Sequence, residues 1–173
     1  MKVVLKTPRL LLRKMTQEDI PSLARILKDE QTMYAYEGAF NDEEVQQWFD
    51  KIMLSYKTYG FGLWAVVLKD TGNMIGQCGL TVQHIDGRDV IEVGYLFERE
   101  YWHRGYAIEA AKSCKEHAFN ELQLDELYTI IRDNNYASMN VAIRNGMLVR
   151  GMILKHYKGV DMPHYIFSIK KRG

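Results

Sequence analysis

A strand-like run, a short loop and a helix-like run follow one another between residues 90 and 122. Residues 90–97 are rich in β-branched and aromatic side chains, whereas residues 106–122 place small and apolar side chains at helical spacing. The loop between them contains Gly105, which has no Cβ and therefore lets another group approach the backbone closely. A helix start carries unpaired N–H groups and the positive end of the helix dipole, so this arrangement predicts a site for a phosphate or diphosphate.

The spacing of the loop differs from the common nucleotide-binding motifs. It contains neither Gly-x-Gly-x-x-Gly nor Gly-Lys-Ser/Thr. It resembles instead the coenzyme A loop of the GNAT family of N-acetyltransferases, Gln/Arg-x-x-Gly-x-Gly/Ala, with an aromatic residue first, as is typical of the ribosomal-protein N-terminal acetyltransferase branch. The resemblance implies acetyl-CoA as co-substrate, held by Trp102, His103, Arg104, Gly105, Tyr106 and Ala107.

Two further segments resemble the same family. The pattern Asn135-x-x-Ser138, followed by Gly146-Met147, is similar to its second cofactor motif, which implies cofactor contacts from Asn135, Ser138 and Asn140. Without the resemblance, the chemistry of Ser138 favours a helix N-cap over a cofactor contact. The opening Thr-Pro-Arg-Leu-Leu-Leu-Arg of residues 7–13 resembles the start of the ribosomal-protein branch, so the likeness extends from residue 7 to residue 169.

The remaining pattern predicts one α/β domain over residues 1–173 with a mixed sheet. Helices are expected from Asp19, from Asn41 to about Tyr59, and over 106–122 and 138–145, while strands are expected at 9–13, 62–68, 74–83, 90–97, 127–131, 149–154 and 165–169. The resemblance adds the acyl-CoA N-acyltransferase fold. In that fold a mostly antiparallel sheet is splayed into a V and flanked by helices.

Composition excludes few classes of protein but sets expectations. The 173 residues are 47% hydrophobic and 26% charged, with a net charge of +1, which gives no argument for nucleic acid. No apolar run approaches the ~20 residues of a membrane span. Cys78 and Cys114 are expected to be buried and reduced, which favours a cytoplasmic location. The five histidines lack the spacing of metal ligands, so no metal is expected. Either a monomer or a homodimer is compatible with the sequence.

Acetyl transfer to an amine requires groups that hold the thioester and remove a proton. The resemblance assigns the thioester end to the backbone of Tyr95, Leu96 and Phe97. Glu92 is the candidate base because an acid inside an apolar strand is costly to bury, although it is also explained by an exposed sheet face. The tyrosine that the family often uses as acid is absent from 138–146, and the ribosomal-protein branch suggests Ser138 instead.

The acceptor is expected to be a protein N-terminus or a small cationic amine. Residues 29–50 carry seven acids and no Lys or Arg, which indicates either an acidic lobe or simply solvated helix faces. Tyr34, Tyr36, Glu37 and Glu92 are the predicted acceptor contacts. We therefore expect acetyl transfer by direct attack in a ternary complex, with a non-catalytic acyl-CoA-binding module as the alternative.

Overall fold

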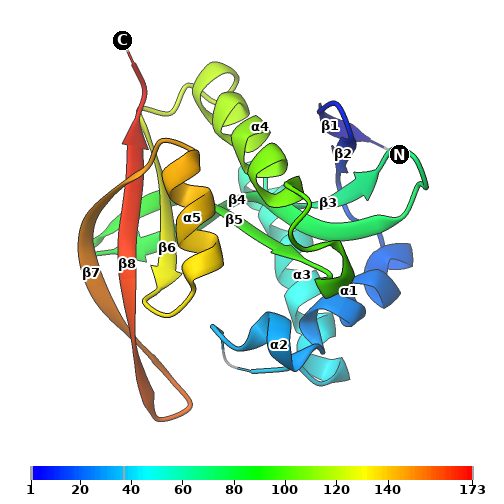
Figure 1. The fold of residues 1–173 in the computed structure, drawn as a ribbon, viewed down its shortest axis with the longest axis horizontal. Helices are drawn as coiled ribbons and strands as arrows, with labels where there is room; N and C mark the ends of the chain where they lie inside the picture. Colours follow the sequence, from blue (N-terminus) through cyan, green and yellow to red (C-terminus); the bar gives the residue numbers. More distant parts are fainter. Residues whose placement is uncertain (1, 37, 173) are drawn as a thin grey trace.

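The computed structural model describes residues 2–36 and 38–172, and its strands form one eight-stranded sheet in the order β1-β2-β3-β4-β5-β6-β8-β7 (Figure 1). The strands are β1 (Val3–Lys6), β2 (Leu10–Arg13), β3 (Leu63–Leu68), β4 (Met74–Ile85), β5 (Arg88–Phe97), β6 (Glu126–Arg132), β7 (Leu148–Tyr157) and β8 (Val160–Lys170). The helices are α1 (Ile20–Leu27), α2 (Glu30–Met33), α3 (Asp42–Tyr59), α4 (Tyr106–Asn120) and α5 (Tyr136–Arg144), with short 3-10 turns η1 (Gln17–Asp19) and η2 (Arg99–Tyr101).

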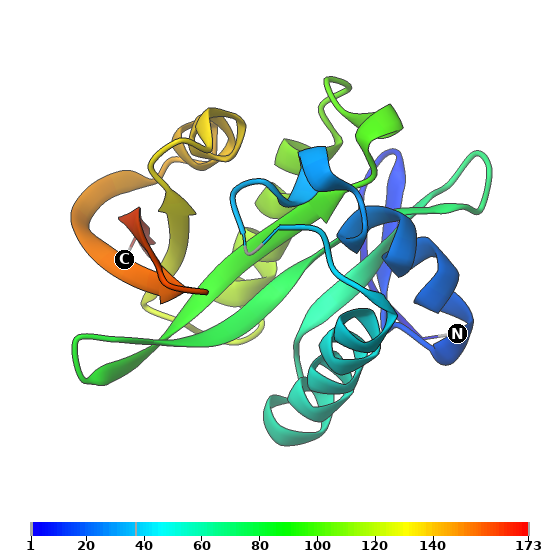
Figure 2. The same ribbon diagram turned by 90° about the horizontal axis from the view of Figure 1, so that it is seen from below.

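The middle of the sheet is splayed. Strands β5 and β6 run parallel, whereas the other neighbouring strands of the described chain run antiparallel. A parallel pair needs a long crossover, which α4 supplies. The two strands are paired at a single position, Glu92 opposite Tyr128, so their carboxyl ends are free to separate. Figure 2 shows the two strands diverging, which confirms the predicted V.

Helices cover both faces of the sheet. In Figures 1 and 2, α1 and α3 lie on one face and α4 on the other. The side of α4 that meets β4 and β5 consists of small residues without exposed surface, namely Ala110, Ala111, Cys114 and Ala118. These short side chains let the helix lie close to the strands, as the sequence predicts. No helix of the described chain is both long and apolar enough to cross a bilayer.

Several local signals act as the sequence predicts. Asn41 and Glu44 form a reciprocal capping box at the start of α3, and Gly60 ends that helix with φ 79°. The turn between β4 and β5 has Asp86 at φ 50° and Gly87 at φ 79°. Two consecutive positive φ angles are typical of a tight hairpin turn, which an Asp-Gly pair in the sequence favours.

Other expectations were wrong. Asn135, not Ser138, caps α5: its Oδ1 accepts the Ser138 N–H at 3.3 Å, and the helix already begins at Tyr136. Strand β1 was not predicted, because its residues are only half-buried at the edge of the sheet and lack a clear alternation.

Candidate active site

A cavity of about 760 Å³ lies where β5 and β6 separate. Its wall is built by α3, by the strands β4 to β7, and by the start of α5. The predicted site residues that line it are Tyr36, Glu92, Tyr95, Leu96, Asn135 and Ser138. Residues separated by about a hundred positions in the sequence are therefore brought to one space by the splayed strands.

The Glu92 carboxylate sits at the point where the two strands part. Its Oε2 accepts the backbone N–H of Ile130 at 2.7 Å, a donor that the separating strands leave unpaired, and Oε1 is 3.5 Å from the Thr81 hydroxyl. Burial raises the pKa of Glu92 above its usual value, and the positive charge of Lys155 on β7 opposes this rise. A carboxyl group with a raised pKa accepts protons better near neutral pH. Glu92 lines the cavity and is half-buried. It therefore does not lie on an exposed face of the sheet, which was the alternative explanation for an acid in this strand.

Tyr95 and Ser138 meet across the V. The Tyr95 hydroxyl donates to the Ser138 carbonyl oxygen at 2.9 Å, which joins β5 to the first turn of α5. Burial raises the pKa of the Tyr95 phenol well above its usual value, so the phenol stays protonated. From the sequence, Tyr95 was expected to contribute only its backbone, at the thioester end of the cofactor. Its position beside Ser138 depends on packing between distant elements, and no local signal predicts it.

The loop before α4 leaves backbone amides available. His103 has φ 63° and Gly105 has φ 80°, so the chain turns through two left-handed residues immediately before the helix. Gly105 is the N-cap and no side chain caps the helix start. Trp102 Nε1 donates to the Phe97 carbonyl oxygen at 2.9 Å, which ties the loop to the end of β5. These uncapped amides fit a diphosphate.

Some predicted site residues lie outside the cavity wall. The Tyr34 hydroxyl donates to the Asn134 carbonyl oxygen at 3.2 Å and so joins the segment after α2 to the segment before α5. Phe97 is buried and its carbonyl is occupied by Trp102. Asn140 is exposed on α5, and Glu37 lies outside the described residues.

Several acidic side chains of residues 29–50 form helix caps and ion pairs within the fold. Asp29 caps α2 and pairs with Arg99 at 3.1 Å, Asp42 pairs with Lys28, and Glu44 belongs to the capping box of α3. Among the described acids of residues 29–50, only Glu44 lines the cavity. The wall also contains Lys51, Arg132 and Lys155, so the described acceptor region is mixed in charge rather than acidic.

Comparison with known proteins decides the family. The model of the acetyltransferase (GNAT) domain matches residues 9–148. The chain belongs to the GNAT acetyltransferase family. It is 36% identical over 160 residues to the uncharacterized protein YkkB of Bacillus subtilis strain 168, covering 92% of this chain and 93% of YkkB. It is 28% identical to the uncharacterized N-acetyltransferase p20 of Bacillus licheniformis, covering 97% and 96%.

Solved GNAT structures share the fold. An acetyltransferase from Bacillus anthracis superposes with a TM-score of 0.82 at 23% identity, covering 98% of each chain. The ribosomal-protein α-N-acetyltransferase RimL in complex with coenzyme A gives a TM-score of 0.79 at 16% identity, also covering 98% of each chain. The family, the fold and the enzyme class predicted from the sequence motifs are therefore confirmed. The protein is an acetyl-CoA-dependent N-acetyltransferase.

Proposed function

We propose that this protein transfers an acetyl group from acetyl-CoA to a primary amine by direct attack in a ternary complex. The observation that carries this proposal is the half-buried Glu92 carboxylate in the wall of the cavity, between the end of β5 and the strands β6 and β7. An ammonium group has a pKa of ~8 to ~10.4, so a base is needed near neutral pH. Glu92, with its raised pKa, is suited to accept that proton directly or through water.

Acetyl-CoA supplies the acetyl thioester, and two parts of the chain fit its other groups. The amides of Gly105, Tyr106 and Ala107 lie at the start of α4, which no side chain caps, and this suits the diphosphate. The end of β5, with Tyr95 and Leu96 in the cavity wall, suits the pantetheine arm. Asn135 and Ser138 form the opposite wall on α5.

A proton donor for the departing sulfur is assigned to Ser138. This residue lines the cavity, and its backbone N–H and carbonyl are held by Asn135 and Tyr95. The Tyr95 phenol is the second candidate, because it is protonated and reaches the same turn of α5. Replacing each by a residue without the hydroxyl, as in Ser138→Ala and Tyr95→Phe, separates the two roles by turnover.

The charges of the cavity favour one class of acceptor. Glu92 and Glu44 share the wall with Lys51, Arg132 and Lys155. A polyamine or aminoglycoside would meet these cations with several of its own, and like charges repel. We therefore propose an acceptor with a single amine, such as a protein N-terminus or a small monoamine. A cytoplasmic location is proposed with it, because Cys78 and Cys114 are free thiols in hydrogen-bond contact, with their sulfurs 3.6 Å apart, and form no disulfide.

The Glu92→Gln variant tests the catalytic role. Gln keeps an oxygen that can accept the Ile130 N–H but cannot take a proton from the amine, so kcat should fall about 100-fold at neutral pH. Thiol release from acetyl-CoA with a panel of monoamines and peptides measures the rate, and calorimetry measures coenzyme A affinity, which should be unchanged. The rate loss should shrink at high pH, where the amine deprotonates in solution.

A matched control is Glu126→Gln on the neighbouring strand. Glu126 also accepts hydrogen bonds, from Ser168 and Tyr128, but does not line the cavity, so its loss should leave turnover near the wild-type value. A Glu92 variant with an unchanged rate at every pH removes Glu92 from the mechanism. Coenzyme A binding without turnover on any amine would favour the non-catalytic binding module.

A further inference from the structure

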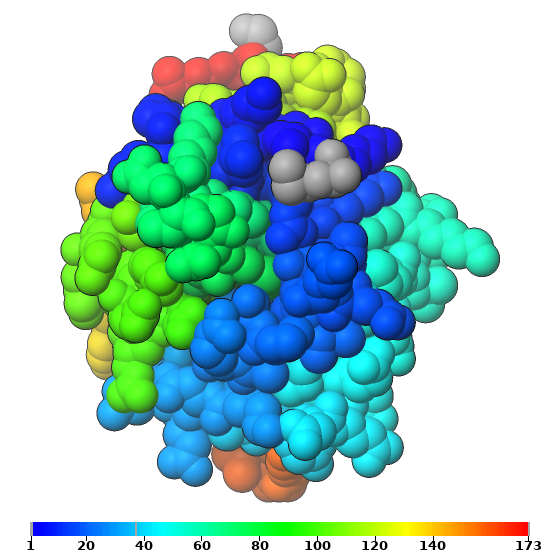
Figure 3. All heavy atoms as spheres, turned by 90° about the vertical axis from the view of Figure 1, so that its right-hand side faces the viewer, coloured from blue at the N-terminus to red at the C-terminus, as the bar shows by residue number. Residues whose placement is uncertain are grey.

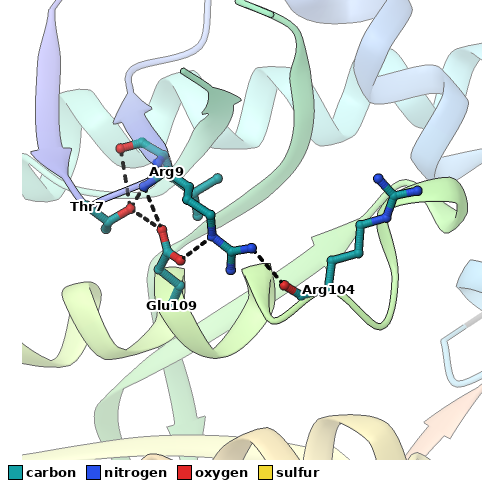
Figure 4. A network of polar contacts seen from close by, with 5 residues as sticks. Thr7, Arg9, Arg104 and Glu109 are labelled. Atoms are coloured by element: carbon teal, nitrogen blue, oxygen red, sulfur yellow. Dashed lines mark hydrogen bonds and ion pairs between the residues drawn. The ribbon is translucent and has the colours of Figure 1, made fainter. Parts of the chain in front are cut away.

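We propose that Arg9 is a positioning residue for the diphosphate loop: it turns the amides before α4 outward and holds Glu109 away from the anion. This inference rests on the proposed use of the loop for coenzyme A. Sequence reasoning treated the Thr-Pro-Arg segment only as an edge strand with a family resemblance. The structure instead places this segment directly against the start of α4 (Figure 4). Figure 3 shows that the blue chain start reaches the surface of the molecule.

One set of contacts runs from the chain start to the loop (Figure 4). Arg9 Nε donates to Glu109 Oε1 at 2.8 Å, and Arg9 Nη1 donates to the Arg104 carbonyl oxygen at 3.0 Å. The guanidinium also lies over the Tyr106 ring, 4.3 Å from its centroid. A single planar group therefore joins the loop to two residues of the first turn of α4, Tyr106 and Glu109.

The bond to the Arg104 carbonyl fixes the direction of an amide. The carbonyl of Arg104 and the N–H of Gly105 belong to one peptide unit, and in a trans peptide they point in opposite directions. Arg9 holds the carbonyl on its own side, so the Gly105 N–H points away from Arg9. A Cβ at Gly105 would lie 3.3 Å from Arg9 Nη2, which shows how closely the two groups approach.

The second part of the contact set restrains a carboxylate. Glu109 lies in the first turn of α4, where a free negative charge would repel a diphosphate. Its Oε2 accepts the Thr7 hydroxyl at 2.6 Å and the Arg9 backbone N–H at 3.1 Å, while Oε1 accepts Arg9 Nε. Despite partial burial, these donors hold the pKa of Glu109 below its usual value, so it stays ionised but paired.

The decisive experiment compares Arg9→Lys with Arg9→Gln. Lysine keeps the positive charge but lacks the planar fork, whose separate Nε and Nη1 atoms serve Glu109 and the Arg104 carbonyl. We expect both variants to weaken binding of coenzyme A, and of dephospho-coenzyme A lacking only the 3′-phosphate, about tenfold. Calorimetry measures these two ligands. Pantetheine, which has no diphosphate, should bind both variants as it binds wild type, as followed by ligand-observed NMR.

The control is Lys28→Gln. The Lys28 side chain is 44% exposed, close to the 45% of Arg9, and it pairs with Asp42 of α3 rather than with the loop or Glu109, so affinity for all three ligands should be unchanged. If Arg9→Lys binds coenzyme A as tightly as wild type does, the positive charge alone accounts for the role of Arg9 and the inference is overturned. An equal loss of affinity for pantetheine would show that Arg9 has a general structural role. A loss confined to coenzyme A would show that Arg9 contacts the 3′-phosphate directly. Either result would overturn the inference. Wild-type protein that binds no coenzyme A would overturn the proposed function itself.

Discussion

The two ends of the site are built in different ways. At the loop before α4 the proposed binding groups are backbone amides, with Gly105 as the N-cap and Arg9 bonded to the Arg104 carbonyl oxygen on the other side. At the acceptor end they are side chains from several elements, and the local charges are mixed. A site made of backbone depends on conformation, whereas a site made of side chains depends on which residues the fold brings together. The two ends should therefore respond to different substitutions.

The largest expected effect comes from Gly105→Asp at the backbone-built end. The residue has φ 80°, a region costly for side chains, and the new carboxylate would stand at the start of α4 where the diphosphate is expected. Coenzyme A affinity should fall about 100-fold or more, as measured by calorimetry.

A glycine of the same conformation provides the control. Gly87 has φ 79° with no neighbouring atom within 4 Å of an added Cβ, and it lies in the hairpin turn between β4 and β5. Gly87→Asp should carry the same backbone strain and leave coenzyme A affinity unchanged. If the two variants bind coenzyme A equally well, the loop is not the diphosphate site.

A smaller effect is expected at the acceptor end from Lys155→Gln. Burial raises the pKa of Glu92 and the Lys155 charge opposes this, so removing the charge should raise that pKa further. The acidic limb of the kcat/KM profile should then move to higher pH, and kcat/KM at a fixed pH on that limb should fall roughly threefold to tenfold.

Lys51→Gln is the comparison, since Lys51 lines the same cavity but is not among the groups that shift the pKa of Glu92. The acidic limb of the kcat/KM profile of Lys51→Gln should lie at the same pH as in wild type. Equal profiles for wild type and Lys155→Gln would mean that Glu92 is not the group that titrates in the reaction.

The contrast between the two ends also explains what the sequence could predict. The loop was predictable because Gly105, the preceding strand and the following helix are contiguous, and backbone geometry follows from local residues. The capping box of Asn41 and the Asp86-Gly87 turn were predictable for the same reason. The sheet order was available only through the family resemblance, because pairing between distant strands leaves no local pattern.

The acceptor end was less predictable because its contacts join distant segments. Tyr34 was expected at the acceptor but bonds to the Asn134 carbonyl, and Lys155 was not singled out although it faces Glu92. The acids of residues 29–50 suggested a cationic substrate, yet Asp29 and Asp42 are used in caps and ion pairs. The sequence gives the number of acidic side chains in this stretch, but only the fold shows which of them are free to contact a substrate.

The smallest expected effect concerns stability at the acceptor end. The folded pKa of Glu92 lies above its usual 4.5, so the native state binds this proton more tightly than the unfolded state. The resulting stability is present at low pH and is lost as pH rises through the folded pKa. Glu92→Gln lacks this loss, so its Tm should match wild type near pH 4 and exceed it by roughly 1–3 °C at pH 8, measured by calorimetric melting. A variant that melts below wild type at pH 8 would instead make the carboxylate, with Lys155 and the Ile130 N–H, a net stabilising group of the V.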